Sequence, residues 1–286
     1  MSEHDTGSPG RQAARERART ALRTERTRRR RNTVLGVGAL VLGALAVVTV
    51  VAVVVAPAAH PDGPGPRNAA SDGVLLRGDH GEVVAARTGA VPTGGTPTPT
   101  RQHDGVADIT VYADYQCPYC NQFETAQFPQ IERWVRDGSA TLELHPVSLL
   151  DSSSLGARYS TRSAAAAACV ADRDPDAFLA FTTALFAKQP SEGTRGLTDD
   201  ELVTMAARVG ADGPATVACI TQQHFAPWVA AATERARSGP LPNSSLAGIT
   251  STPTVLVDGR QYGTDPRTQS LTDPAQFAAF VAHARR

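Results

Sequence analysis

The pattern of hydrophobic and polar residues changes character several times along this chain, and the strongest contrast lies at residues 33–56. No charged residue interrupts this apolar run. At 1.5 Å per residue it would form roughly 36 Å of helix, which is long enough to cross a bilayer. Several arginines stand directly before it, so the positive-inside rule predicts that residues 1–32 form a cytoplasmic basic tail. We therefore expect a single-pass cell-membrane protein with an extracytoplasmic domain.

The same run has a second interpretation as a cleaved signal peptide. Residues 56–58 read Ala-Pro-Ala, which resembles a small-residue cleavage site. The hydrophobic region of a signal peptide spans roughly 7 to 15 residues, and the run at 33–56 is longer, which favours an anchor. If residues 33–56 are an anchor, the lipid bilayer is one predicted partner of the chain.

Residues 57–106 are rich in Pro, Gly and small polar residues, a composition typical of a tether. Within them, short apolar segments at 74–76 and 83–86 predict a short hairpin packed on the domain. The domain proper is predicted to begin at residue 107.

From residue 107 onward the pattern indicates an α/β domain. Strand-forming residues lead into a Cys-Pro-Tyr-Cys turn, and large apolar residues then recur at helical spacing from Pro118 to an Asp-Gly stop at 137–138. A second strand is predicted at 140–150. The turn therefore lies between a strand and the first turn of a helix.

The rest of the domain is predicted to be mostly helical before a strand returns. The predicted helical insertion covers about residues 152–240 and contains several helical segments. One of them begins with the capping signal Thr-Asp-Asp-Glu. Strand residues reappear at 253–257, followed by an Asp-Gly hairpin turn and a final helix capped by Asp273.

Composition and charge narrow the classes of function. The chain has 286 residues and a formal net charge of zero, but the first 32 residues hold ten Arg against four acidic residues, so the remainder is about −6. This balance leaves the domain without a basic surface for nucleic acid, and we expect no nucleic-acid partner.

The four cysteines carry the candidate chemistry. A zinc site needs four ligands at characteristic spacings, and the second Cys-x-x-Cys or spaced His pair that would supply them does not occur, so no metal is expected. A thiolate at Cys117 would face the unpaired N–H groups and positive dipole end of the following helix, which lowers its pKa. We expect Cys117 to be the nucleophile and Cys120 to resolve the mixed disulfide.

Four features give the chain a family resemblance. They are DYQCPYC at 114–120, YSTRS at 159–163 leading into Cys169, the second pair Cys169 and Cys219, and ITSTPT at 249–254. Residues 107–286 resemble the DsbA-like disulfide oxidoreductases of the thioredoxin superfamily, in particular the membrane-anchored actinobacterial type. The resemblance implies an α/β thioredoxin-like fold with an inserted all-helical subdomain.

The resemblance also implies roles for individual residues. Pro118 and Tyr119 would shape the active-site loop. Pro253 would be a cis-proline lying against the cysteine pair, with Thr252 offering backbone groups to an extended client peptide. Cys169 and Cys219 would form a structural disulfide, although the residues alone also allow two free buried thiols or a second redox pair.

Two acidic residues near the motif have open roles. Asp114, three positions before the first cysteine, and Glu124, one turn after the second, could tune the pKa of a cysteine. For both residues, a capping or solvated carboxylate is the favoured interpretation.

These features predict an extracytoplasmic thiol-disulfide oxidoreductase without a cofactor, which introduces disulfides into secreted or surface proteins. The resemblance implies a membrane redox partner similar to vitamin K epoxide reductase. The alternatives are an extracytoplasmic disulfide reductase or isomerase, or a non-catalytic tethered binding module. A glutaredoxin shares the Cys-Pro-Tyr-Cys motif, but the predicted membrane helix and the long helical insertion argue against it.

Overall fold

The structure is a computed structural model that describes residues 63–100 and 105–284. The predicted basic tail at 1–32, the predicted membrane helix at 33–56 and the start of the predicted tether at 57–62 lie outside the described residues. Among the helices that the structure does describe, none combines the length and the apolar character needed to cross a membrane.

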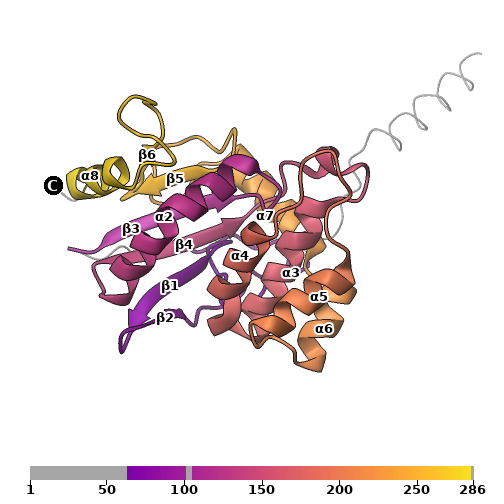
Figure 1. The fold of residues 1–286 in the computed structure, drawn as a ribbon. Coiled ribbons are helices and arrows are strands. Elements are labelled where there is room, and N and C mark those ends of the chain that lie inside the picture. The colour runs from indigo at the N-terminus through magenta and orange to yellow at the C-terminus, as the bar shows by residue number, and fades with distance from the viewer. Residues whose placement is uncertain (1–62, 101–104, 285–286) are drawn as a thin grey trace, which may run out of the picture. The chain divides into compact units, whose positions relative to one another are not determined.

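Strands and helices follow one another from residue 107 in the predicted order (Figure 1). The strands are β1 (Val74–Asp79), β2 (Glu82–Ala85), β3 (Ala107–Ala113), β4 (Ala140–Pro146), β5 (Thr254–Val257) and β6 (Arg260–Tyr262). The α-helices are α2 (Pro118–Arg136), α3 (Tyr159–Arg173), α4 (Phe178–Ala187), α5 (Asp199–Arg208), α6 (Pro214–Thr221), α7 (Ala226–Ser238) and α8 (Pro274–Ala284). Short 3-10 helices occur at η1 (Asp151–Ser154) and η2 (Pro175–Ala177).

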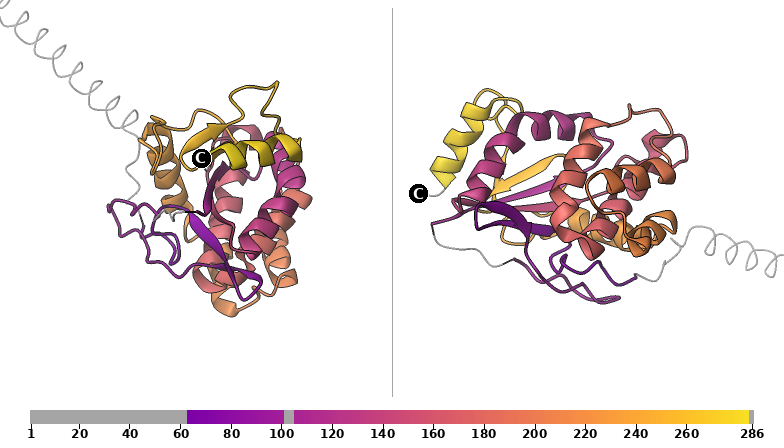
Figure 2. Two further views of the ribbon diagram at one scale, coloured as in Figure 1. Left: turned by 90° about the vertical axis from the view of Figure 1, so that its left-hand side faces the viewer. Right: turned by 60° about the horizontal axis from the view of Figure 1, so that its bottom comes forward.

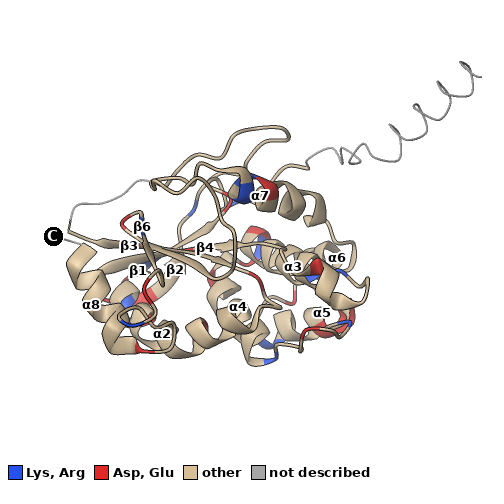
Figure 3. Cartoon of the chain, turned by 90° about the horizontal axis from the view of Figure 1, so that it is seen from above, with Lys and Arg blue, Asp and Glu red and all other residues tan. Residues whose placement is uncertain are grey.

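The strands form one mixed sheet in the order β2-β1-β4-β3-β5-β6. Its central pair, β3 and β4, is parallel, with Ile109 opposite Leu142, and the other neighbouring strands are antiparallel. Parallel neighbours need a crossover connection, and α2 supplies it. Helices α2 and α8 cover one face of the sheet and α7 covers the other (Figure 3).

The hairpin of β1 and β2 belongs to this sheet, which corrects the predicted domain boundary at residue 107. Strand β1 pairs with β4, and its residues Val74 and Leu76 are 2% and 1% exposed. The Pro-rich stretch after the hairpin is also held, because the Thr100 hydroxyl donates to the buried Glu143 carboxylate of β4. The composition resembles a tether, but long-range pairing incorporates residues 63–100 into the domain (Figure 1).

Helix α2 presents the Cys-Pro-Tyr-Cys motif at its N-terminus. Pro118 occupies the first helical position, where its missing N–H has no partner to lose. Phe123 and Ile131 lie on the buried side of the helix. The helix ends at Arg136, and Gly138 beyond it adopts the left-handed conformation at φ 78°, as the Asp-Gly signal predicted.

Helices α3 to α7 form the predicted helical subdomain, with α3 at its centre (Figure 2). The alanines at 164–168 of α3 are at most 2% exposed. Their small side chains let the neighbouring helices approach closely, which is why an Ala-rich run lies in the core. Thr198 and Glu201 form the predicted capping box at the start of α5.

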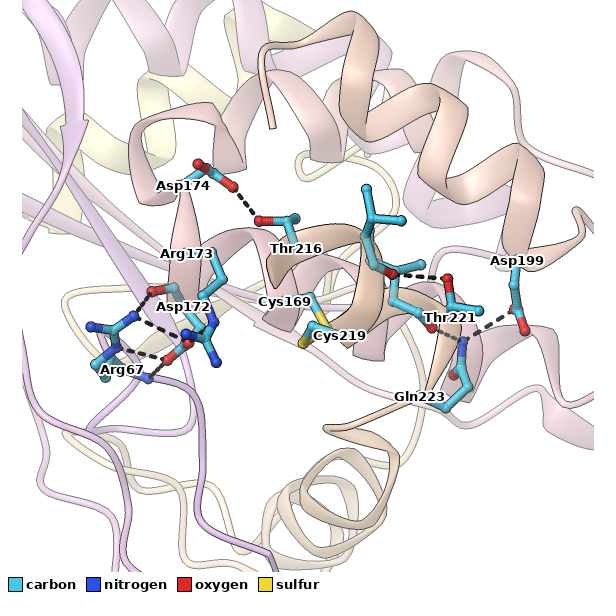
Figure 4. Close-up of a disulfide and its surroundings, with 12 residues drawn as sticks. Arg67, Cys169, Asp172, Arg173, Asp174, Asp199, Thr216, Cys219, Thr221 and Gln223 are labelled. Carbon is cyan, nitrogen blue, oxygen red and sulfur yellow. Dashed lines mark hydrogen bonds and ion pairs between the residues drawn. A yellow bond between two sulfur atoms is a disulfide. The ribbon is translucent and has the colours of Figure 1, made fainter. Parts of the chain in front are cut away.

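A disulfide joins Cys169 of α3 to Cys219 of α6, with the two Cα atoms 5.7 Å apart (Figure 4). This is the pairing that the resemblance implied, and it excludes two free thiols. The two residues are 0% and 6% exposed, and the bond joins two helices of the subdomain. Beside it, the Thr216 hydroxyl donates to Asp174 at 2.6 Å, a second link between α6 and the end of α3 (Figure 4).

Candidate active site

Cys117 and Cys120 lie where β3 passes into α2. Cys117 is the N-cap of α2 with an extended backbone (φ −76°, ψ 117°), and its carbonyl accepts the N–H of Cys120 at 3.0 Å and of Asn121 at 3.2 Å. Both thiols are free, and the residues are 4% and 2% exposed. The first cysteine therefore stands at the positive end of a 19-residue helix, as the sequence predicted.

Several donors lower the pKa of the Cys117 thiol to about 6. The largest cause is the hydrogen bond from the Cys120 thiol, and burial opposes it. The Thr252 side chain and the backbone N–H groups of Cys120 and Tyr119 add further stabilisation of the thiolate. Cys117 is therefore mostly ionised at neutral pH and serves as a nucleophile or as a leaving group.

The surroundings of Cys120 shift its pKa in the opposite direction. Burial raises its pKa well above the ordinary value of cysteine, and the hydrogen bond and negative charge of Cys117 raise it further. At neutral pH the reduced pair therefore carries one thiol proton, which is bound to Cys120. A thiol of this kind reacts only within the pair, which suits the predicted resolving role.

The loop that precedes β5 packs against Cys117 from far along the chain. The Thr252-Pro253 peptide bond is cis, as the resemblance implied, and the Thr252 carbonyl lies 3.2 Å from Cys117 Sγ, where it accepts the S–H when the thiol is protonated. Strand β5 pairs with β3, placing Tyr112 opposite Thr254, and this pairing brings the loop to the carboxyl end of β3. Sheet pairing therefore assembles the two halves of the site.

The dipeptide between the cysteines forms the outer surface of the site. Pro118 and Tyr119 are both exposed, and Tyr119 reaches 61%, which is unusual for a large aromatic side chain in this protein. Of the predicted active-site loop residues, Tyr119 and Thr252 contact the Cys117 sulfur, and Pro118 and Pro253 are their neighbours in the chain.

Asp114 is fully buried, so the alternative of a solvated carboxylate is wrong. Its two oxygens accept the N–H of Gln116 at 2.8 Å and of Leu150 at 2.9 Å, which caps the loop before the motif. Burial raises its pKa to about 6, and these hydrogen bonds oppose the rise. Its links to the cysteines run through its backbone, because its N–H contacts the sulfur of Cys120 and its carbonyl accepts the N–H of Cys117 at 3.0 Å.

Glu124 is also buried, at 7% exposure. Burial raises its pKa to about 7, opposed by a hydrogen bond from Thr183 of α4. The side chain therefore links α2 to α4, and the solvated alternative is wrong here as well.

Gln189 is a site residue that the sequence did not indicate. It follows the end of α4, and its side-chain NH₂ group donates to the carbonyls of Tyr115 at 3.1 Å and Cys117 at 2.9 Å. Its side-chain oxygen accepts from Asn121 at 3.3 Å. Since 72 residues separate Gln189 from Cys117, no local spacing could have revealed the contact.

Metal-binding groups do not converge in the region of the chain that the structure describes. Within residues 63–100 and 105–284, no cluster of three or more His, Cys, Asp or Glu side chains has the arrangement of a metal site. The chemistry of the candidate site rests on the two sulfurs.

Comparisons with known proteins agree with this chemistry. A family model described as Thioredoxin matches residues 103–275. The chain is similar to the reduced form of a disulfide bond oxidoreductase (DsbG) from Mycobacterium tuberculosis, with 30% identity and a TM-score of 0.50 over 62% of this chain and 77% of that one. It is similar to oxidised DsbA of the same bacterium, with 27% identity and a TM-score of 0.53 over 74% of this chain and 92% of that one.

Two further comparisons say less about the function of this chain. BdbD from Bacillus subtilis shares the fold, with 18% identity and a TM-score of 0.54 over 79% of this chain and 98% of that one. A segment of the serine/threonine-protein kinase PknE from Mycobacterium tuberculosis is 35% identical over 116 residues, which are 39% of this chain. The chain spans 20% of the length of that relative, so the similarity concerns one segment of it.

Proposed function

The chain belongs to the thioredoxin family and is a DsbA-like thiol-disulfide oxidoreductase, and from this premise we propose that it oxidises client proteins outside the cytoplasm. The observation that carries the direction of the reaction is the low pKa of Cys117, about 6. The donors around this sulfur stabilise a thiolate, which exists only in the reduced enzyme. Stabilising the reduced form makes the disulfide form a stronger oxidant.

The reaction starts from the Cys117–Cys120 disulfide. A client thiolate attacks Cys117 Sγ, and the electron pair of the S–S bond leaves on Cys120, which takes up a proton because of its high pKa. A second client thiolate then attacks the client sulfur of the mixed disulfide, and Cys117 leaves as a thiolate. The client loses two electrons and two protons and gains a disulfide, and the enzyme becomes the reduced pair.

The cis-proline loop is the proposed place for the client backbone. Thr252 lies against Cys117, and the exposed Tyr119 flanks the same sulfur. An extended peptide that paired with the backbone beside Thr252 would bring its cysteine to Cys117, which is recognition by strand addition. Its partners would be secreted or surface proteins with free thiols.

Each cycle leaves two electrons on the enzyme, and a turnover requires an acceptor for them. We propose a membrane-embedded disulfide-forming oxidase of the vitamin K epoxide reductase-like class. The apolar run at 33–56 and the arginines before it support an anchored enzyme with its domain on the oxidising side of the membrane.

The test is the reduction potential of the Cys117–Cys120 pair in the full-length protein in detergent, equilibrated in glutathione buffers. We expect a value near that of a strong oxidant, about −120 mV. A value near about −270 mV, typical of a reductase, would overturn the proposed direction and support the alternative of an extracytoplasmic reductase or isomerase. Cys117→Ser serves as the control, because it should abolish the transition altogether.

The location has a separate test. Protease added to intact cells should digest the domain, while the protein should sediment with membranes and resist extraction at high salt. A domain that is protected in intact cells and digested only after lysis would place it in the cytoplasm and contradict the proposal.

A further inference from the structure

Gln189 is the point where the helical subdomain contacts the backbone of the active-site loop. Its NH₂ group uses both hydrogens on carbonyls of that loop, at Tyr115 (3.1 Å) and at Cys117 (2.9 Å). Its oxygen accepts from Asn121 (3.3 Å), whose own oxygen accepts from Thr125 (3.1 Å). A flipped amide would set an oxygen against two carbonyl oxygens, so the network itself determines the orientation of Gln189.

The two carbonyls flank the residue before the nucleophile. The Cys117 carbonyl is also the acceptor of the first turn of α2, because it receives the N–H groups of Cys120 and Asn121. Gln189 therefore holds the backbone on both sides of Gln116 and at the N-cap. The position of Cys117 Sγ relative to the N–H groups of Tyr119 and Cys120 depends on this backbone.

Gln189 is anchored through its backbone as well as through its side chain. It stands just beyond α4, its N–H donates to the Phe186 carbonyl at 3.1 Å, and Pro190 follows it. Helix α4 makes a second contact with the loop, where the Tyr115 hydroxyl and the Thr182 hydroxyl lie 3.0 Å apart. A side chain fixed at both ends is able to transmit the position of the subdomain to the loop.

We propose that Gln189 is a positioning residue of the exchange reaction, which holds the Cys117 loop in the conformation that stabilises the thiolate. The inference deepens the proposed function and rests on it. Gln189 touches neither sulfur, and it acts through the carbonyls of Tyr115 and Cys117. The helical insertion thereby contributes to reactivity as well as to the core.

The test uses Gln189→Met in the full-length protein, because Met matches the length of Gln and removes the amide. Without the two hydrogen bonds the loop relaxes, and the thiolate loses contact with its N–H donors while the uncharged disulfide is little affected. We expect a rise in the pKa of Cys117, read from thiolate absorbance at 240 nm. We also expect roughly a three- to tenfold fall in the equilibrium constant for oxidising glutathione.

Two further variants complete the experiment. Asn121→Ala removes the contact to the Gln189 oxygen and keeps the NH₂ donors, so it should give a smaller shift in the same direction, and the shift should not add to that of Gln189→Met. Gln122→Ala is the matched control, because Gln122 is an exposed glutamine of α2 that lines one open surface pocket together with Gln189. It should leave both readouts at the wild-type values.

A merely structural role would lower the melting temperature and leave the pKa of Cys117 and the equilibrium constant unchanged, and that result would overturn the inference. If circular dichroism shows that Gln189→Met does not fold, the Asn121→Ala variant is the test. A shifted pKa of Cys117 in that variant supports the inference, and an unshifted pKa overturns it. Thiolate absorbance needs no client, so failure of the wild type to oxidise clients would refute the proposed function separately.

Discussion

At the scale of residues, the two cysteines differ because of what surrounds each sulfur. Cys117 lies at a helix N-terminus among N–H and hydroxyl donors, and its pKa falls to about 6. Cys120 sits one turn deeper, where burial raises its pKa and the neighbouring thiolate raises it further. One helix turn therefore separates the nucleophile from the thiol that keeps the proton.

The pH dependence of alkylation tests this difference. In the reduced protein, the thiolate of Cys117 is present above its pKa of about 6 and is lost as the pH falls through that value. We expect the rate of its reaction with iodoacetamide to be half-maximal near pH 6, with Cys120 unmodified in the native protein. Mass spectrometry of the alkylated peptide identifies the residue. A midpoint near the value of an ordinary cysteine, about 8.5, would contradict the assignment.

The side chain of Thr252 offers a second test at this scale. Its hydrogen bond lowers the pKa of Cys117, so Thr252→Ala should raise that pKa by roughly half a unit to one unit. Thr252→Ser keeps the hydroxyl and should stay close to the wild type. The measurement is thiolate absorbance against pH, and equal shifts in both variants would show that the hydroxyl does not contribute.

At the scale of elements, α2 presents the motif and the helical subdomain supports it. The Ala-rich α3 forms the centre of that subdomain, and the Cys169–Cys219 bond joins it to α6 across 50 residues of sequence. Because both cysteines lie within helices and neither stands at a helix N-terminus, we expect the bond to act on stability rather than on exchange.

Removing the Cys169–Cys219 disulfide should therefore lower the stability of the domain without changing thiol-disulfide exchange at Cys117. The variant with both Cys169→Ala and Cys219→Ala loses the closure of a 50-residue loop, which is worth about 4 kcal/mol in the chain-entropy model. Urea unfolding should show this loss, while the reduction potential of the Cys117–Cys120 pair stays unchanged. A potential that moved with the bond would indicate a second redox pair instead.

At the scale of the whole molecule, the domain includes residues that read as a tether. The hairpin adds two strands to the sheet, and β1 covers the edge of β4 that carries Leu142 and Leu144. Both leucines are buried, at 1% and 3% exposure. The domain is therefore larger than the matched family region, which starts at residue 103.

Two truncated proteins test where the domain starts. A chain that begins at residue 63 keeps β1 and should fold, with a cooperative thermal transition. A chain that begins at residue 107 exposes the edge of β4 and its apolar residues, and it should aggregate or melt at a clearly lower temperature. Circular dichroism and size-exclusion chromatography measure both, and equal melting temperatures would restore the boundary at 107.

The sequence by itself determined the features that arise from neighbouring residues. The strand, the turn and the helix around Cys117 follow from apolar periodicity and from Pro118 at the first helical position. The capping box of Thr198 and the turn at Asp258 follow in the same way from side chains close along the chain. The resemblance added the cis-proline and the Cys169–Cys219 pairing, which no local pattern contains.

Only the tertiary structure decided what depends on distant neighbours. The pattern of apolar and polar residues around Asp114 is compatible with a solvated or a buried side chain. Its burial follows from contacts such as the one with the N–H of Leu150. The pairing of β1 with β4, the carbonyl of Thr252 at Cys117 and the amide of Gln189 all join residues far apart in the chain. Hydrophobic periodicity and turn chemistry are local properties, whereas burial, and with it the pKa of a side chain, is set by whatever the folded chain brings against it.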